Sequence, residues 1–135
     1  MASILRVNTL TDASSNNSVP MATVAQGSAK VRAQYMGLTN TLQTGALNNS
    51  SVTDNATGDF THAFSSSFSD IKYSVVGGVQ YLAGTSLAIA AYGPQDNTAR
   101  ETGQVRMESH FLAQSANRAN FDHDVNDLVC YGDLA

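Results

Sequence analysis

The 135-residue sequence predicts an all-β fold, an antiparallel β-sandwich of jelly-roll-like type. Three observations support this prediction. Short segments in which apolar and polar side chains alternate recur along the chain, as expected of strands with one buried face. Groups of Gly, Asn, Asp, Ser and Pro, which favour turns, separate these segments at intervals of roughly 8 to 15 residues. No long apolar stripe follows the helical period, so about seven or eight short strands are expected.

The N-terminal segment predicts an arm that lies outside the sandwich. A polar stretch of turn-forming residues, 11–18, follows a short apolar segment. Such a segment cannot bury its apolar side chains within itself, so it is expected to dock on the domain, on a second copy or on another protein. The candidate attachment residues are Ile4, Leu5, Val7 and Leu10. We therefore divide the chain into an extended anchoring arm with its linker, residues 1–28, and one sandwich domain, residues 29–135. The alternative for the arm is an ordinary first strand of the sandwich.

The clearest strand near the start of the domain begins after Ala29. One set of its side chains is expected to face the core: Val31, Ala33 and Tyr35. The opposite set is expected to face solvent: Lys30, Arg32 and Gln34. Residues 38–47 carry several threonines, with Gly37 before them and Gly45 near their end, and they predict either a short strand or an irregular link.

The middle of the chain predicts a hairpin. Strands are predicted at Ser50–Thr53 and Phe60–Phe64, and residues 54–59 between them are a dense group of turn formers. This group includes Gly58, which can adopt the positive φ that a tight turn requires.

The next two predicted strands are rich in glycine and other small residues. Residues 71–82 alternate in part, and Gly77-Gly78 interrupts the alternation, which predicts a β-bulge. In residues 85–92, Leu87 and Ile89 alternate with alanines. Small side chains on both faces suit a strand in a buried, central position.

The last third of the chain predicts two further strands, residues 104–111 and 125–131. In the first, one face carries Val105, Met107, Ser109 and Phe111, and the other carries Arg106, Glu108 and His110. Residues 96–103 include good helix formers and predict at most one or two helical turns. Residues 113–124 predict a polar loop.

The composition restricts the classes of partner. Only 13% of the residues are charged and the formal net charge is −4, whereas about a quarter of the residues are charged in typical domains. A neutral surface rich in hydroxyl and amide groups is expected, which disfavours nucleic acid. No apolar run reaches the roughly 18 residues that span a membrane, and the N-terminus lacks a signal-peptide layout. We therefore expect that the chain does not insert into a membrane and that it is made in a cytoplasm. The single cysteine, Cys130, is expected to be a buried thiol in a strand.

The sequence carries no pattern typical of a catalytic centre, so we expect neither an enzyme nor a cofactor. It has no Gly-x-Ser-x-Gly motif, and Cys130 has no base near it in the sequence. The most suggestive cluster is Asp122-His123-Asp124 with Asp127, because clustered carboxylate oxygens can bind Ca²⁺. The cluster lacks the glycine turn and terminal glutamate of an EF-hand, and a solvated acidic loop is the alternative.

Recognition of a ligand is the remaining function, and tyrosines and polar loops are its candidates. Tyrosine has an apolar face and a polar tip, so it can stack on a sugar and bind its hydroxyls; packing in the core is the alternative. The tyrosines considered are Tyr73, Tyr81, Tyr92 and Tyr131. Residues 93–98 and 114–124 are the longest polar loops, and loops held by a rigid scaffold often carry binding surfaces. The candidate receptor-facing residues are Gln95, Asp96, Asn97, Asn117, Arg118 and Asn120.

Four short segments also stand out by their order and spacing: Ser3–Ser14, Ala25–Lys30, Ser51–Phe60 and Tyr131–Ala135. Together they resemble a family of small tail-fibre and virion surface proteins of marine and freshwater tailed phages, of the cyanophage- and pelagiphage-like kind. The resemblance implies a structural protein of the virion, most simply a tail fibre that is attached by its N-terminus, forms a homotrimer and contributes to host adsorption. The implied partners are further copies of the chain, other virion proteins of the tail or capsid, and a host surface glycan or protein.

Two alternatives stay open. A capsid decoration or head-fibre protein would grip the head with the same arm and be present in hundreds of copies per particle, whereas a fibre is present in few. A glycan-binding surface module would have no virion partner and would bind glycan when purified alone.

Overall fold

The computed structural model of the chain describes residues 7–11, 13–14, 18–80, 89–96, 99–112 and 118–135. Strands dominate this part of the chain, and each strand pairing is antiparallel, so the prediction of an all-β, antiparallel fold is confirmed. None of its helices combines the length and the apolar character needed to span a membrane. The elements in chain order are β1 (Thr9–Thr11), β2 (Ser18–Pro20), α1 (Met21–Gly27), β3 (Val31–Met36), β4 (Thr41–Leu42), β5 (Asn49–Ala56), β6 (Asp59–Phe64), β7 (Ser74–Gln80), β8 (Ile89–Pro94), β9 (Arg100–Glu101), β10 (Gln104–Leu112), β11 (Arg118–Asn120) and β12 (Val125–Tyr131).

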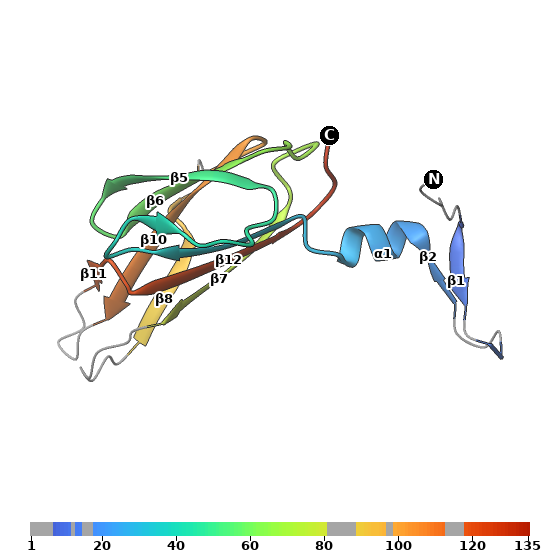
Figure 1. Cartoon of the computed structure of the whole chain (residues 1–135), viewed down its shortest axis with the longest axis horizontal. Helices are drawn as coiled ribbons and strands as arrows, with labels where there is room; N and C mark the ends of the chain where they lie inside the picture. Colours follow the sequence, from blue (N-terminus) through green and yellow to red (C-terminus); the bar gives the residue numbers. More distant parts are fainter. Residues whose placement is uncertain (1–6, 12, 15–17, 81–88, 97–98, 113–117) are drawn as a thin grey trace.

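A four-stranded sheet has the order β4-β3-β12-β7. The alternation predicted for β3 is confirmed, because Val31, Ala33 and Tyr35 are buried whereas Arg32 and Gln34 are exposed. The final predicted strand coincides with β12. Its pairing with β3 brings the C-terminal strand of the domain beside its first strand (Figure 1).

A six-stranded sheet is built around β10. Met107 of β10 pairs with Phe60 of β6 and also with Pro94 of β8, so these two strands lie on opposite sides of β10. The alternation predicted for β10 is confirmed, since Val105 and Met107 are fully buried. β5 continues the sheet beyond β6, while β9 and β11 pair with the two ends of β10.

One hydrophobic core joins the inner faces of both sheets. The four-stranded sheet contributes Val31, Ala33, Tyr35, Leu128 and Cys130, and the six-stranded sheet contributes Phe60, Phe64, Tyr92, Val105 and Met107. The rings of Tyr35 and Phe60 meet edge to face across the core, with centroids 4.9 Å apart. Such aromatic contacts stabilise the packing beyond the burial of area alone.

The predicted hairpin is present as β5 and β6, with a tighter turn than expected. Both strands extend into the region assigned to the turn, and only Thr57 and Gly58 connect them. Gly58 has a φ of +66°, and a Cβ there would lie 2.3 Å from the carbonyl oxygen of Ser109. Glycine is therefore required by both the turn and the close approach of β10.

The predicted bulge at Gly77-Gly78 is wrong. β7 pairs with β12 in continuous register through both glycines. A Cβ on Gly77 would lie 2.1 Å from the carbonyl oxygen of Tyr92, so glycine permits the close approach of β8 to β7. The central position predicted for residues 85–92 is also wrong for the part described, because β8 pairs only with β10 there; residues 85–88 lie outside the described residues.

Two further segments contain strands that the sequence analysis did not predict. Residues 96–103, for which at most one or two helical turns were expected, contain no helix where they are described; β9 and the turn at Thr102–Gly103 lead into β10. The predicted loop 113–124 contains β11, because Arg118–Asn120 pairs with the end of β10. In both places, pairing with β10 outweighs the weak local preference for helix or loop.

The N-terminal arm is not extended. β1 and β2 form a hairpin, and α1 connects it to β3, so that the hairpin stands away from the two large sheets (Figure 1). α1 begins after Pro20 and ends at Gly27, and Ser28 has extended backbone. Proline suits the start of a helix because it lacks the N–H that would otherwise be left without a partner.

Candidate functional site

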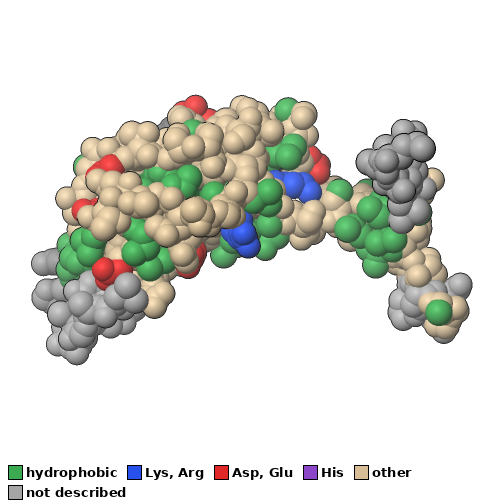
Figure 2. All heavy atoms as spheres, viewed as in Figure 1, with side chains coloured by type: hydrophobic (Ala, Val, Ile, Leu, Met, Phe, Trp, Pro, Cys, Tyr) green, Lys and Arg blue, Asp and Glu red, His purple; other side chains and the backbone are tan. Residues whose placement is uncertain are grey.

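The arm presents apolar side chains to solvent. Leu10 and Val19 face each other across the hairpin and are 46% and 42% exposed, and Val7 and Val24 are also exposed. No residue of α1 is buried. Hydrophobic side chains gather over α1 and β2 in Figure 2. Of the four predicted attachment residues, the structure places Val7 and Leu10 on this exposed surface, and Ile4 and Leu5 lie outside the described residues.

The arm joins the domain through a short, hydrogen-bonded link. The ammonium group of Lys30 binds the carbonyl oxygen of Ala25 near the end of α1 and also the hydroxyl of Ser28, 2.9 Å away. A cation at this position complements the negative end of the helix dipole. The backbone N–H of Lys30 donates to the carbonyl of Cys130 on β12, at 2.8 Å. The same residue therefore holds the helix end and the first strand of the domain.

The structure describes four of the six predicted receptor-facing residues, and they lie at two places along β10. Gln95 and Asp96 follow β8, and the N–H of Gln95 donates to the carbonyl of Arg106 at 3.2 Å. Asn120 pairs with His110, four residues further along β10, which corresponds to about 13 Å along a strand. Arg118 lies in β11 as well, and Asn97 and Asn117 lie outside the described residues.

Gln95 and Asp96 line a depression of about 320 Å³, here called the loop pocket. Its other lining residues are Thr61, Ala99, Glu101, Gln104 and Arg106. The guanidinium of Arg106 forms an ion pair with Asp59, with 2.8 Å between Nε and Oδ1, and its hydrogen bonds lower the pKa of the Asp59 carboxyl. The pocket offers hydroxyl, amide and carboxylate groups without an aromatic side chain.

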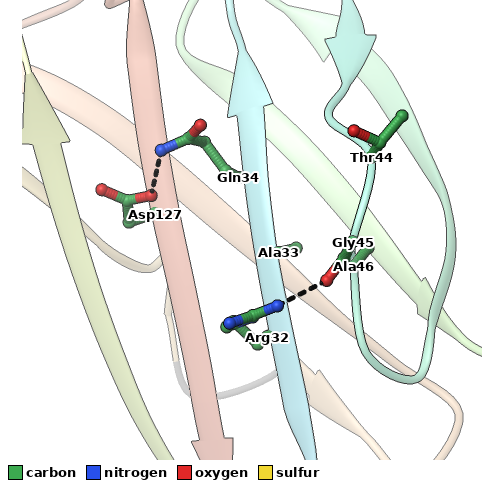
Figure 3. Close-up of a pocket in the computed structure, with 7 residues that line it drawn as sticks. All are labelled: Arg32, Ala33, Gln34, Thr44, Gly45, Ala46 and Asp127. Carbon is green, nitrogen blue, oxygen red and sulfur yellow. Dashed lines mark hydrogen bonds between the residues drawn. The ribbon is translucent and has the colours of Figure 1, made fainter.

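A second depression of about 260 Å³, the sheet pocket, lies on the outer face of the four-stranded sheet (Figure 3). Arg32 Nη2 donates to the carbonyl oxygen of Gly45 at 2.8 Å, and Gln34 Nε2 donates to Asp127 Oδ1 at 3.1 Å. These bonds pair the polar groups of the pocket with one another. The Arg32 bond also holds the segment around Gly45 against β3.

The four tyrosines considered for sugar binding differ in exposure. Tyr73 and Tyr92 are buried, so core packing is the correct interpretation for both. Tyr81 lies outside the described residues. Tyr131 is 36% exposed and lines a third depression of about 320 Å³, the junction pocket, which α1 borders through Gln26.

A buried polar network that the sequence analysis missed connects β10 to β12. Asn126 Nδ2 donates to the carbonyls of Tyr35 and His123, at 3.5 and 3.3 Å, so its Oδ1 must be an acceptor. Ser109 Oγ donates to this oxygen at 3.0 Å, and therefore accepts from Nδ1 of His123 at 2.6 Å. Nδ1 of His123 therefore carries a proton, and the buried Nε2 has no partner among the described residues.

This network is not arranged for nucleophilic catalysis. Ser109, His123 and Asn126 are fully buried, and the serine hydroxyl donates to an amide oxygen rather than to the imidazole. Burial lowers the pKa of His123, which keeps the ring neutral. The inward position of Ser109 in the alternation of β10 was the sequence signal that a polar group lies in the core.

The acidic cluster does not converge on a cation. Asp122 Oδ1 accepts a 2.6 Å hydrogen bond from the N–H of Gly58, and Asp127 accepts from Gln34 on the outer face of the sheet. His123 points inward to Ser109. Among the described residues, no three His, Cys, Asp or Glu side chains group closely enough to hold a metal ion.

The thiol of Cys130 is buried in the core, as the sequence predicts. Burial raises its pKa to about 12, so the thiolate that a nucleophile requires is disfavoured.

Comparison with family models, with curated proteins and with solved structures found no match to this chain. The proposals below therefore depend on the residues and the geometry described above.

Proposed function

We propose that this chain is a structural protein of a tailed-phage virion, a tail fibre that is attached through residues 1–28 and contributes to host adsorption. The observation that carries the proposal is the arm, in which a hairpin and a helix stand away from the sheets with no buried residue in the helix. The four sequence segments that resemble virion surface proteins support the same role.

The physical argument concerns the stability of the hairpin. A two-stranded hairpin alone in water is marginally stable, because it lacks a further strand or helix on which to bury its side chains. Leu10 and Val19 are paired on this hairpin and remain largely exposed. Contact with another virion protein would cover them and would also provide partners for the open strand edges.

We propose further that residues 29–135 form a jelly-roll-like sandwich. The shared core of the two large sheets supports this arrangement, since side chains from both inner faces belong to one cluster. A homotrimer fits the same role, because three arms close together would convert weak contacts with a host surface into effective adhesion. The low charge of the chain imposes little repulsion between copies.

The test is to label purified phage particles for this protein, count its copies and locate them by electron microscopy. Few copies at the tail, in multiples of three, are expected. Hundreds of copies on the head would replace the fibre with a capsid decoration protein, and absence from particles would overturn both virion roles. Native mass spectrometry of the purified chain tests the trimer separately, and a monomer at high micromolar concentration would refute it.

A glycan-binding surface module is the second candidate, and the exposed Tyr131 in the junction pocket favours it. Binding of glycan by the purified chain, together with absence from particles, would establish it in place of the virion role.

A further inference from the structure

We infer that the junction pocket binds a neutral saccharide ring against Tyr131. The pocket lies where α1 approaches the ends of β7 and β12, and its volume of about 320 Å³ is at the lower end of the range for ligand pockets. The inference does not depend on the proposed virion role.

Behind the pocket lies a buried aromatic pair, Phe68 and Tyr73, which are among its lining residues. The rings of Phe68 and Tyr73 are stacked, with centroids 4.2 Å apart and an interplanar angle of 16°. The Tyr73 hydroxyl lies 3.0 Å from the carbonyl oxygens of both Glu101 and Gln104, and its single proton is shared between these two acceptors, which holds that ring in place. Gly132 lies against this pair, since a Cβ there would be 2.7 Å from Cβ of Tyr73. The backbone at Gly132, next to Tyr131, is therefore held close to this packed pair.

The rim of the pocket is polar and already ordered. Asp70 Oδ1 accepts a 2.7 Å hydrogen bond from the backbone N–H of Lys72, which orients that carboxylate. The N–H and the hydroxyl of Ser69 both donate to the carbonyl of Asp133, at 2.8 and 3.1 Å, which fixes the segment carrying the second carboxylate. Gln26 adds an amide from α1.

This combination matches the chemistry of a pyranose. One face of such a ring presents C–H groups that pack on an aromatic side chain, and its edge presents hydroxyls that bind carboxylate, ammonium and amide groups. Two acidic residues, Asp70 and Asp133, and one basic residue, Lys72, line the pocket, so its rim has a net negative charge. Acidic sugars and phosphorylated ligands are therefore disfavoured. The loop pocket offers similar polar groups but no aromatic platform, which makes it the weaker candidate.

The experiment is an NMR titration of the full chain with methyl glycosides of glucose, galactose, mannose and N-acetylglucosamine, and with sialic acid and glucose 6-phosphate as acidic probes. Saturable shifts of the amides of Tyr131 to Asp133 are expected for at least one neutral glycoside, with a dissociation constant on the order of millimolar. No saturable shift for any neutral glycoside up to about 50 mM, or tighter binding of the acidic probes, would overturn the inference.

Variants separate stacking from a general effect on the fold. Tyr131→Ala should weaken binding by about tenfold or more, and Tyr131→Phe, which keeps the ring, should stay within about threefold. Asp133→Asn should also weaken binding, because it removes a charged acceptor. Leu38→Ala, at an exposed side chain outside the pocket lining, is the matched control and should bind like the unmodified chain. Equal affinity of Tyr131→Ala and the control would refute the stacking role.

Discussion

His62 and Tyr92 are joined in the core by a hydrogen bond of 2.5 Å between Nε2 of the imidazole and the tyrosine hydroxyl. The direction of this bond follows from Asn49, whose Nδ2 donates to the carbonyl of Ala63 at 2.9 Å. Its Oδ1 is therefore the acceptor for Nδ1 of His62, at 3.4 Å. His62 carries its proton on Nδ1, and Tyr92 donates to the bare Nε2.

Replacing the donor should destabilise the domain. Tyr92→Phe preserves the ring that packs against Phe60 but leaves Nε2 of His62 buried without a donor. The free energy of unfolding is expected to fall by about 1–3 kcal/mol, the cost of an unsatisfied buried acceptor. Urea denaturation measures this change. Tyr131→Phe, at an exposed ring, is the control and should leave the urea midpoint unaltered; equal stability of the two variants would contradict the assigned bond.

The stability of the fold should already fall at pH values above those at which most carboxylates titrate. Burial lowers the pKa of His62 from 6.5 to about 4, so between these values the unfolded chain binds more protons than the folded chain. Stability is then fully present above pH 6.5 and declines as the pH falls toward 4. The loss from His62 is on the order of 3 kcal/mol, and His123 contributes in the same direction because burial lowers its pKa as well.

Urea midpoints measured from pH 7.5 to 4 test this expectation. His62→Gln removes one titrating ring and should reduce the dependence on pH. Asp59 provides an internal contrast, because the hydrogen bond from Arg106 lowers its carboxyl pKa from 3.8. Its stabilisation is lost only as the pH falls through this lowered value, below the histidine window. A flat profile between pH 6.5 and 4 would contradict the assignment of buried, neutral histidines.

A methyl group at Gly77 should disrupt the approach of β7 and β8. A Cβ at this position would meet the carbonyl oxygen of Tyr92 at 2.1 Å, which forces the two strands apart. Gly77→Ala is expected to cost at least about 1–3 kcal/mol of stability, as overpacking does. Gly93→Ala on β8 is the matched control, since a Cβ there meets nothing within 4 Å. Thermal unfolding compares them, and similar melting temperatures would show that the strands do not approach closely.

Polar residues on the hairpin should uncouple attachment from folding. Leu10→Ser combined with Val19→Ser removes the exposed apolar pair of the arm without touching the core. The melting temperature of the purified chain should change by less than about 4 °C, while the number of copies recovered on phage particles should fall strongly. Leu38→Ser, at an exposed side chain of the domain, controls for lost apolar surface. Normal incorporation of the double variant would place attachment elsewhere.

The predicted receptor-facing residues and tyrosines show what local sequence patterns can predict and what they cannot. Polar composition selected Gln95 and Asp96, and both line a pocket. It also grouped them with Asn120, which the pairing of β11 with β10 places apart from them. The four tyrosines look alike in the sequence, yet Tyr73 and Tyr92 are buried, whereas Tyr131 is exposed. Their positions relative to distant strands decide which ring can meet a ligand.

The sequence by itself determined that β3, β10 and β12 are strands and, for β3 and β10, which face is buried. It could do so because the two-residue alternation of side chains is a property of the strand backbone itself. Only the tertiary structure showed that β8 lies at a sheet edge, that Gly77 permits the close approach of β8, and that the arm is folded. It also revealed the two buried histidine networks. The arm pairs residues that are close in the sequence, but their turn signals did not predict its hairpin and helix. The other features depend on groups that are far apart in the sequence, and their hydrogen bonding and packing are settled only when the strands pair.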